Sequence, residues 1–545
     1  MNDSTTVYQA RRILTMDAAT PEATHVAVGG GRIVAVGGAE LAQRYGNGDG
    51  NVDPLFADMV LTPGFVEGHA HSMEGMIWKL PYIGFHARIH PDGHRVDGCA
   101  TVAALVQRLR ELESALPADA TLFAWGYDPI YFPDKPMRGD LDAVSAARPV
   151  VLFHSNLHLI TVNSAALNAA GIHRGNVIDG VYVDADGEPN GELAEFAAVF
   201  PVLRAVGDPV FHGQDDPEGL RRFGRSCWRA GITTTADLYN ALEPPVVDMF
   251  AAVTAEADFP ARIVPALSTL NLSPAEVIAR SEALPARNHD KLHFGAVKII
   301  TDGSIQGYSA RVRRPYINGV ENGVWCDAPA KLQAMMRETH AAGVKLHIHV
   351  NGDQASELTL DALEDAIAKH GALARGRRHV LQHAQMMDAA QLQRAAGLGL
   401  LVNLFANHTY YWGDQHRDAT VGPDLAPRMN AARTALDAGL EIAIHCDAPV
   451  TPMGPLFTAW CAVNRRTASG REHGIDECIT AAEALRAITL GPANTLDLDD
   501  RIGSIAPGKF ADFTALDDDP LRVPPMRIRD IKVRGTMLGG RWQGA

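Results

Sequence analysis

Residues 59–71 read MVLTPGFVEGHAH, an apolar run followed by two histidines. The apolar part, Met59–Val66, predicts a β-strand, and amphipathic stretches such as Pro329–Ala342 and Glu357–His370 predict helices further along the chain. Seven more apolar runs alternate with helical stretches: Thr233–Leu238, Arg262–Leu267, Phe294–Ile300, Val344–Val350, His379–His383, Leu398–Phe405 and Leu440–His445. Eight alternations of strand and helix indicate an α/β protein whose parallel strands close into a (β/α)₈ TIM barrel.

Both ends of the chain indicate β-structure of another kind. Residues 24–38, THVAVGGGRIVAVGG, are two β-rich runs joined by three glycines, and Phe510–Leu516 and Ile531–Trp542 indicate short strands near the C-terminus. We therefore expect a small β-sandwich domain built from residues 1–62 and 500–545, with the barrel spanning residues 63–499. Residues 76–220 differ from the repeating units in Pro, Gly and aromatic content, so we expect a long insertion over the barrel mouth, after the first barrel strand.

The composition narrows the class of protein. The 545 residues include 49 Lys and Arg against 64 Asp and Glu, a net charge of −15, which argues against binding to nucleic acid or to an anionic membrane surface. No run approaches the ~18 apolar residues of a transmembrane helix, and the N-terminus lacks an apolar stretch of signal-peptide length. We expect a cytoplasmic protein with a small-molecule substrate, and self-association into a homo-oligomer is left open.

The metal-binding residue types are distributed unevenly. The 6 cysteines include no CxxC pair, which argues against a disulfide framework or a thiolate zinc site, whereas 22 histidines offer imidazole ligands. Because strand side chains alternate, His69 and His71 point the same way at the end of the first run. A lone HxH is a weak signal that also suits two polar residues on a turn.

Other strand ends repeat this pattern. Active sites of such barrels lie at the carboxyl ends of the strands, so the last polar residue of each run is the best ligand candidate: His349, His383 and Asp447. His347, His379 and His445 share the alternation but should lie deeper, where hydrogen bonding is favoured over metal ligation.

Lys298 stands inside the apolar run Ala296–Ile300. A charged ammonium is costly to bury. The Lys298 side chain could reach solvent or an ion partner. Alternatively, its neutral amine could add CO₂ and form a carbamate that bridges two cations.

Together these segments resemble the amidohydrolase superfamily, and within it the metal-dependent amidohydrolases related to N-substituted formamide deformylases. The resemblance rests on six segments in the family's order: Thr62–His71, Val297–Ser304, His349–Asp353, His383–Gln385, Asp447–Val450 and Gly503–Asp512. Three residues depart from the family pattern: Glu67 stands in place of Asp, Gln382 in place of Glu, and Cys446 in place of Ser or Thr. These departures predict altered hydrogen bonding around the metal ligands and leave the substrate open.

The resemblance implies a binuclear metal centre. His69, His71 and Asp447 would hold one divalent ion, His349 and His383 a second, and N6-carboxylated Lys298 would bridge them. Zinc is the expected ion, although the same nitrogen and oxygen ligands suit manganese, iron or nickel. Metal-activated hydroxide would attack the substrate carbonyl, and Asp447, as the catalytic residue, would pass the proton to the leaving amine.

Further residues are predicted to bind the substrate. In the insertion these are Trp125, Tyr127, Asp128 and His158, and on the seventh strand His408 falls where the family has a pocket histidine. Core packing is an equal alternative for Trp125 and Tyr127.

The resulting prediction is a hydrolase of amide-type C–N bonds other than peptide bonds, acting on an N-acyl or N-formyl compound. Hydrolysis of an ester, carbamate or lactone at the same site is the alternative. Deaminases of the superfamily usually lack the bridging lysine, so Lys298 disfavours a deaminase, and the complete ligand set disfavours a metal-free scaffold.

Overall fold

The computed structural model describes residues 5–46, 52–132, 135–210 and 215–544. The chain forms two compact units. The barrel unit comprises Met1–His71, Gly224–Ala448 and Met453–Ala545, and the insertion unit comprises Ser72–Phe223 and Pro449–Pro452. These two units group the terminal segments with the barrel, whereas we predicted a separate terminal domain. The three-part division into terminal domain, barrel and insertion stays a prediction. Within the described residues, no helix combines the length and the apolar character needed to span a membrane.

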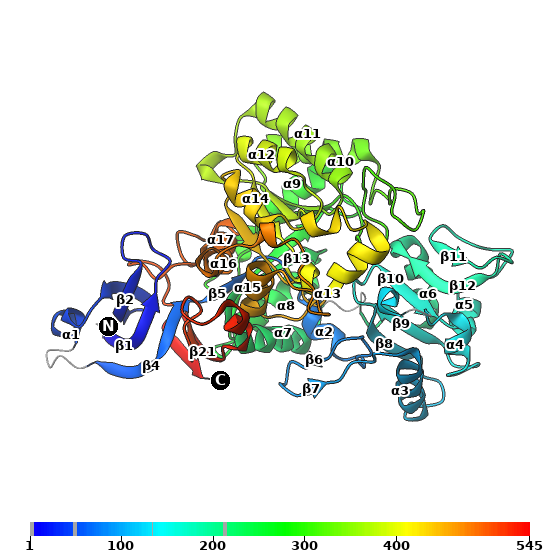
Figure 1. Cartoon of the computed structure of the whole chain (residues 1–545), viewed down its shortest axis with the longest axis horizontal. Coiled ribbons are helices and arrows are strands. Elements are labelled where there is room, and N and C mark those ends of the chain that lie inside the picture. The colour runs from blue at the N-terminus through cyan, green and yellow to red at the C-terminus, as the bar shows by residue number, and fades with distance from the viewer. Residues whose placement is uncertain (1–4, 47–51, 133–134, 211–214, 545) are drawn as a thin grey trace. The chain divides into compact units, whose positions relative to one another are not determined.

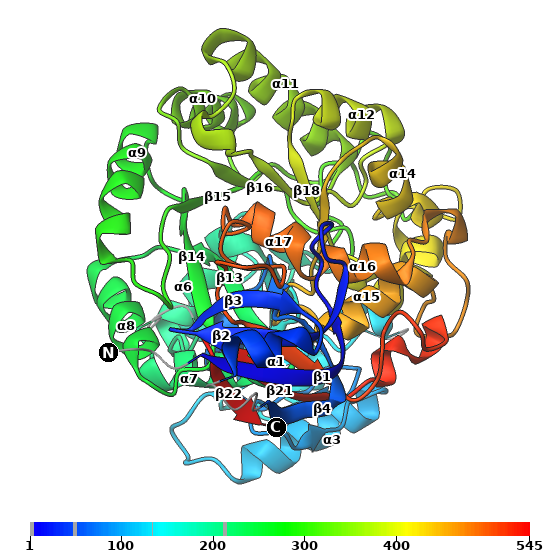
Figure 2. The same ribbon diagram turned by 90° about the vertical axis from the view of Figure 1, so that its left-hand side faces the viewer.

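An eight-stranded parallel sheet forms the centre of the barrel unit, which confirms the predicted α/β barrel class (Figure 2). In chain order its strands are β5 (Phe65–Glu67), β13 (Ile232–Asn240), β14 (Arg262–Ser268), β15 (Ala296–Ile300), β16 (Leu346–Val350), β17 (Val380–His383), β18 (Leu401–Leu404) and β19 (Ile442–Ile444). Each strand pairs with the next. Just beyond β5 and β19, the Asp447 amide donates to His69 O (3.1 Å) and the His71 amide to Ala448 O (2.9 Å), so the first and last strands are joined at their carboxyl ends.

The first barrel strand differs from its predicted bounds. Most of Met59–Val66 belongs to β4 (Asp53–Pro63) of the terminal sheet, and only β5 enters the barrel. The switch occurs at Pro63 and Gly64, where Pro63 has no amide proton to continue the ladder. A Cβ at Gly64 would lie 2.0 Å from Thr233 Oγ1 on the neighbouring strand, so only glycine allows the chain to pass there.

Helices cover the outside of the barrel strands (Figure 2). They include α8 (Pro244–Ala255), α9 (Pro274–Ala283), α10 (Pro329–Ala341), α11 (Asp353–His370), α12 (Ala389–Gly397) and α14 (Ala432–Asp437), with α15 (Pro455–Asn464), α16 (Ala481–Ala487) and α17 (Leu490–Thr495) following β19. Local sequence sets several of their starts. Ser273 with Glu276, Asp388 with Gln391, and Thr480 with Glu483 form capping boxes that satisfy the first amides of α9, α12 and α16.

Strands from both chain ends share a second sheet, ordered β22-β21-β20-β4-β1-β2-β3 (Figure 2). They are β1 (Thr6–Leu14), β2 (Glu22–Gly29), β3 (Arg32–Gly37), β4, β20 (Phe513–Leu516), β21 (Val533–Leu538) and β22 (Arg541–Gly544), beside the short helix α1 (Glu40–Tyr45). The predicted glycine turn joins β2 to β3, with Gly30 and Gly31 at φ of +58° and +75°. The rings of Phe56 on β4 and Trp542 on β22 meet at 5.0 Å although two strands separate them in the sheet, so the sheet curls around one core, as in a sandwich.

The insertion unit has its own sheet, ordered β11-β12-β10-β9-β8 (Figure 1). Its strands are β8 (Leu122–Tyr127), β9 (Val150–His154), β10 (Leu159–Val162), β11 (Val181–Val183) and β12 (Pro189–Ala194). Beside it lie α2 (Met73–Ile77), the two-residue strands β6 (Arg88–Ile89) and β7 (Arg95–Val96), α3 (Val102–Ser114), α4 (Arg138–Asp142), α5 (Ser164–Ala169) and α6 (Glu195–Val206). A separate apolar core, including Trp78, Trp125 and Phe153, stabilises this unit.

Candidate metal centre

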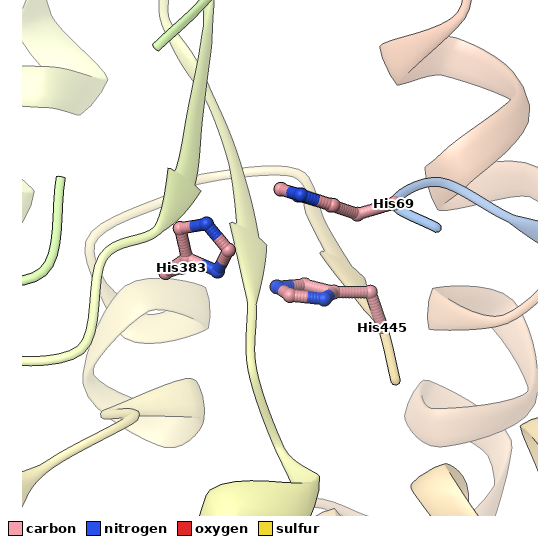
Figure 3. Close-up of side chains that lie close together, drawn as sticks. All are labelled: His69, His383 and His445. Atoms are coloured by element: carbon pink, nitrogen blue, oxygen red, sulfur yellow. The ribbon is translucent and has the colours of Figure 1, made fainter. Parts of the chain in front are cut away.

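Three imidazoles gather at the carboxyl ends of the barrel strands, from segments far apart in the sequence (Figure 3). His69 follows β5, His383 ends β17 and His445 follows β19. The His69 ring stacks on that of His445 with centroids 4.6 Å apart and lies 4.5 Å from that of His383. All three are buried, and their nearest ring nitrogens lie within 4.8 Å of one another.

His69 also belongs to a second group, with His71 and Asp447. His71 Nε2 lies 3.0 Å and His69 Nε2 3.4 Å from Asp447 Oδ1, and Lys298 Nζ lies 3.3 Å from His69 Nε2. These contacts join four of the six predicted ligands, His69, His71, Lys298 and Asp447.

The orientation of His69 is set by Gln382. His69 Nδ1 donates to Gln382 Oε1 at 2.7 Å, and Asn403 Nδ2 donates to the same oxygen at 2.9 Å. Because Nδ1 carries the proton, His69 presents an unprotonated Nε2 towards Lys298 and Asp447. A ring held in this way is prepared to ligate a metal through Nε2.

His383 gives the clearest indication of a metal-binding position. Both of its ring nitrogens are buried and have no hydrogen-bond partner among the described residues, and Nδ1 lies 3.7 Å from Asp447 Oδ2. His383 and Asp447 also have φ of +67° and +57°, conformations that are strained for residues with a Cβ. Buried polar atoms are almost always paired, so these nitrogens fit a divalent cation.

The sequence pattern missed His445 as part of this group. We predicted a deeper, hydrogen-bonded position, but both of its ring nitrogens are buried without a partner among the described residues, beside His69 and His383. Its alternation with Asp447 was visible in the sequence. How far the strand end projects into the barrel was not.

His349 lies at the edge of the group, with its ring 4.5 Å from that of His383. Its Nε2 lies 3.2 Å from Gly303 O and 3.0 Å from Asn351 Nδ2. Asp302, in the segment after β15, accepts hydrogen bonds from the amides of Asn351 and Gly352, just after β16, and from the amide of Arg311. Burial raises the pKa of Asp302 to about 7 despite these bonds.

Burial controls the charges in the group. It lowers the pKa values of His69 and His383 well below the usual range, so both rings are neutral, as metal ligation requires. Burial likewise lowers the pKa of Lys298 to about 7. For Asp447 burial alone would raise the pKa, but the hydrogen bond from His71 and the nearby charges of His71, His445 and Lys298 together lower it. Asp447 is therefore a carboxylate at neutral pH.

The Phe405 ring lies between His408 and His445. His408 is near the start of α13 (Asn407–Gln415), and its ring is 4.4 Å from that of Phe405, which in turn stacks on His445 at 4.7 Å. Its Nδ1 is 2.9 Å from Nε2 of His416, a buried residue that sequence reasoning did not identify. His416 begins a short π-helical turn, His416–Thr420, and such turns occur often at functional sites.

The other predicted substrate-binding residues belong to the insertion unit. The Trp125 and Tyr127 side chains lie in its apolar cores, where Trp125 Nε1 donates to Leu80 O and the Tyr127 hydroxyl to Pro136 O. Asp128 accepts from the Ile130 amide, and His158 Nδ1 lies 3.2 Å from Glu195 Oε2. Trp125 and Tyr127 thus have the packing role that was the alternative for them, and substrate contact by these residues stays a prediction.

Comparison with known proteins identifies a family that spans most of the chain. Residues 57–542 match the amidohydrolase family. The putative amidohydrolase YtcJ of Bacillus subtilis (strain 168) is 30% identical over 518 residues, covering 92% of each chain. The N-substituted formamide deformylase of Arthrobacter pascens is 26% identical over 555 residues, covering 97% of this chain and 96% of that relative.

A solved structure has the same fold. An uncharacterized metal-dependent hydrolase from Pyrococcus horikoshii OT3 aligns with a TM-score of 0.72 at 20% identity, covering 96% of this chain and 99% of that chain. The family match begins inside β4 and ends inside β22, the last strand of the chain's described residues. With its histidines and aspartate gathered at the barrel strand ends, this chain belongs to the amidohydrolase family.

Proposed function

We propose that this protein is a metal-dependent hydrolase that cleaves an amide-type C–N bond, other than a peptide bond, in an N-acyl or N-formyl compound. The observation that carries the proposal is the buried His383, whose two ring nitrogens have no hydrogen-bond partner among the described residues and lie beside the Asp447 carboxylate and the oriented His69. The overall similarity to an N-substituted formamide deformylase supports the class of bond.

Two divalent ions, with zinc the first expectation, would be held by nitrogen and oxygen ligands. His69, His71 and Asp447 would hold one ion, His349 and His383 the other, and N6-carboxylated Lys298 would bridge them. The burial that lowers the pKa of Lys298 to about 7 favours the neutral amine that this carboxylation needs. A single ion held by His69, His383 and His445 is the alternative arrangement, because their nitrogens also converge.

A bound divalent cation polarises a carbonyl and makes water more acidic. The residues of this chain then handle the protons. Asp447, kept ionised by its neighbours, is suited to accept the proton of the attacking water and to deliver it to the leaving nitrogen. Water adds to the carbonyl carbon as the C–N bond breaks, giving a carboxylic acid and an amine.

His408 is suited to orient the substrate. We infer that the Thr420 hydroxyl donates to His416 O, as many helical threonines do to the preceding turn. His416 Nδ1 then donates to Thr420 Oγ1, and His416 Nε2 accepts the proton of His408 Nδ1. His408 Nε2 is then left as an acceptor, which suits the N–H of a secondary amide.

Two measurements test this function. Metal analysis of the purified protein, with ¹³C NMR after exposure to ¹³CO₂, should show bound divalent metal and a lysine carbamate signal that is absent from Lys298→Ala. A panel of N-formyl, N-acetyl, N-acyl-amino-acid, carbamate and ester substrates should show turnover of amides by the loaded protein. Turnover of esters or carbamates without any amide would replace the proposed bond class, and absence of metal would reject the proposal.

A further inference from the structure

A polar cavity lies at the opposite end of the barrel strands from the metal centre. It has a volume of about 200 Å³, and its polar lining includes His293, Lys345, His347, Arg377, Asp497 and Arg501. Lys345 immediately precedes β16 and Arg377 precedes β17, so these groups lie where the strands begin. The metal ligands lie where the strands end.

Positive charge exceeds negative charge in this cavity. Lys345 is 2% exposed and donates from Nζ to Asp497 Oδ1 (2.5 Å), while Arg377 Nε donates to Asp497 Oδ2 (3.0 Å). One carboxylate is therefore shared between two cations. The third cation, Arg501, has one loose ion-pair partner among the described residues, Asp500, which lies 3.9 Å away and outside the lining.

His347 adds a neutral donor, and the hydrogen bonds to its ring determine which nitrogen carries the proton. Gln382 uses its carbonyl oxygen for His69 Nδ1, so its amide nitrogen faces His347 Nδ1 at 2.8 Å and donates to it. His347 Nδ1 is thus an acceptor, and the proton must be on Nε2. Nε2 has no partner among the described residues, and the ring lines the cavity.

His293 is a further polar side chain in the lining of this cavity. Its Nε2 is buried and has no partner among the described residues. Burial, together with the charges of Arg262 and Arg501, lowers the pKa of His293 to about 4, so the ring stays neutral beside these cations. The neutral His293 ring adds no charge, so the charged side chains in this lining are mainly cations, and His347 Nε2–H is a donor among them.

We propose that this cavity binds a small oxyanion, such as inorganic phosphate or a short carboxylate. An oxyanion is an acceptor that would pair with Arg501, Arg377 and the His347 Nε2–H, and hydrogen bonds of this charge-assisted kind are strong. About 200 Å³ corresponds to roughly six or seven waters at ~30 Å³ each, which accommodates such an anion but is below the usual size of drug-like ligand pockets. The chain His347–Gln382–His69 connects this site to a predicted metal ligand by hydrogen bonds.

Isothermal titration calorimetry on the full-length, metal-loaded protein tests the proposal, with inorganic phosphate in one arm and succinate in the other. Arg377→Gln and Arg501→Gln remove charges from partly exposed side chains, so both variants should fold, as circular dichroism can verify. Arg486→Gln is the matched control, because Arg486 and Arg501 both have 49% exposed side chains and only Arg501 lines the cavity.

We expect saturable binding of at least one anion, with affinity about tenfold or more weaker in Arg377→Gln and Arg501→Gln, since each loses a charged hydrogen bond. Arg486→Gln should bind as the unmodified protein does. Binding in only one arm identifies the anion class. Equal affinity in all variants would place the anion elsewhere, for instance at the metal centre, and would overturn the proposal, as would absence of saturable binding in both arms.

Discussion

Replacement of Gln382 by leucine should remove the hydrogen bond that orients His69 in the metal centre. Gln382 is fully buried on β17 and makes three side-chain hydrogen bonds. It accepts from His69 Nδ1 and Asn403 Nδ2 and donates to His347 Nδ1. Leucine has a similar size but leaves all three of these buried groups without a partner.

The size of the effect follows from these contacts. A buried polar group without a partner costs about 1–3 kcal/mol, so three such groups should lower the free energy of unfolding by at least about 3 kcal/mol. His69 also loses the contact that keeps its proton on Nδ1. Loss of such a partner typically lowers metal affinity 10–100-fold, and we expect zinc affinity to fall within this range.

Two assays and one control distinguish the two effects. Urea unfolding of the metal-free protein measures stability, and competition with a chelator measures zinc affinity. Gln391→Leu is the control, because the buried Gln391 also makes three side-chain hydrogen bonds, to Asp353, Glu357 and Asp388, none of which is a predicted metal ligand. It should lower stability but leave zinc affinity unchanged.

Unchanged zinc affinity in Gln382→Leu would refute the claim that Gln382 orients a metal-binding imidazole. An equal loss of affinity in Gln391→Leu would show that general destabilisation, and not the orientation of His69, explains the result.

Three further outcomes follow. Lys298→Ala should lose metal and amide hydrolysis together, as measured by elemental analysis and turnover, and an active, fully loaded variant would contradict the bridging role. Treatment with a chelator should lower the melting temperature, because a ligand bound only to the folded state stabilises it, and adding zinc back should restore it. Burial raises the pKa of Glu74 from 4.5 to about 7, so the folded state retains a proton that the unfolded state releases, and stability falls as the pH rises from about 4.5 through about 7. Glu74→Gln removes this loss and should be more stable than the unmodified protein by about 3 kcal/mol at pH 8 and nearly equal at pH 4.5 in urea unfolding, whereas a difference independent of pH would show that burial does not shift this carboxyl.

The barrel could be predicted because its signal is local and repeated. Each strand is a short apolar run, and each following helix has its own amphipathic pattern and often its own cap, as Ser273 and Glu276 show for α9. The boundary between β4 and β5 could not be predicted, because apolar residues stand on both sides of Pro63 and Gly64 and suggest a single strand. Only the close approach of Gly64 to Thr233 shows where the chain changes sheets.

The candidate site could likewise be predicted only in part. His69, His71 and Asp447 could be identified from strand ends and alternation, and the structure places them in contact. His445 was assigned to a deeper position, because period-two alternation gives the face of a strand but not its depth in the barrel. The roles of His416, at the end of α13, and of Asp302, in the loop after β15, depend on segments that fold back onto the strand ends, which no spacing in the sequence predicts.

By itself, the sequence determined the eight strand–helix units, the terminal strands, and the residue types at the strand ends, because these depend on hydrophobic periodicity within short segments. Tertiary structure alone decided which nitrogen of His69 carries its proton and that, within the described part of the chain, the ring nitrogens of His383 and His445 have no hydrogen-bond partner. It also decided that Lys345, Arg377 and Arg501 share a cavity with the carboxylate of Asp497. The reason is physical: proton positions, burial and local charge are set by atoms from segments hundreds of residues apart, which meet only when the barrel closes.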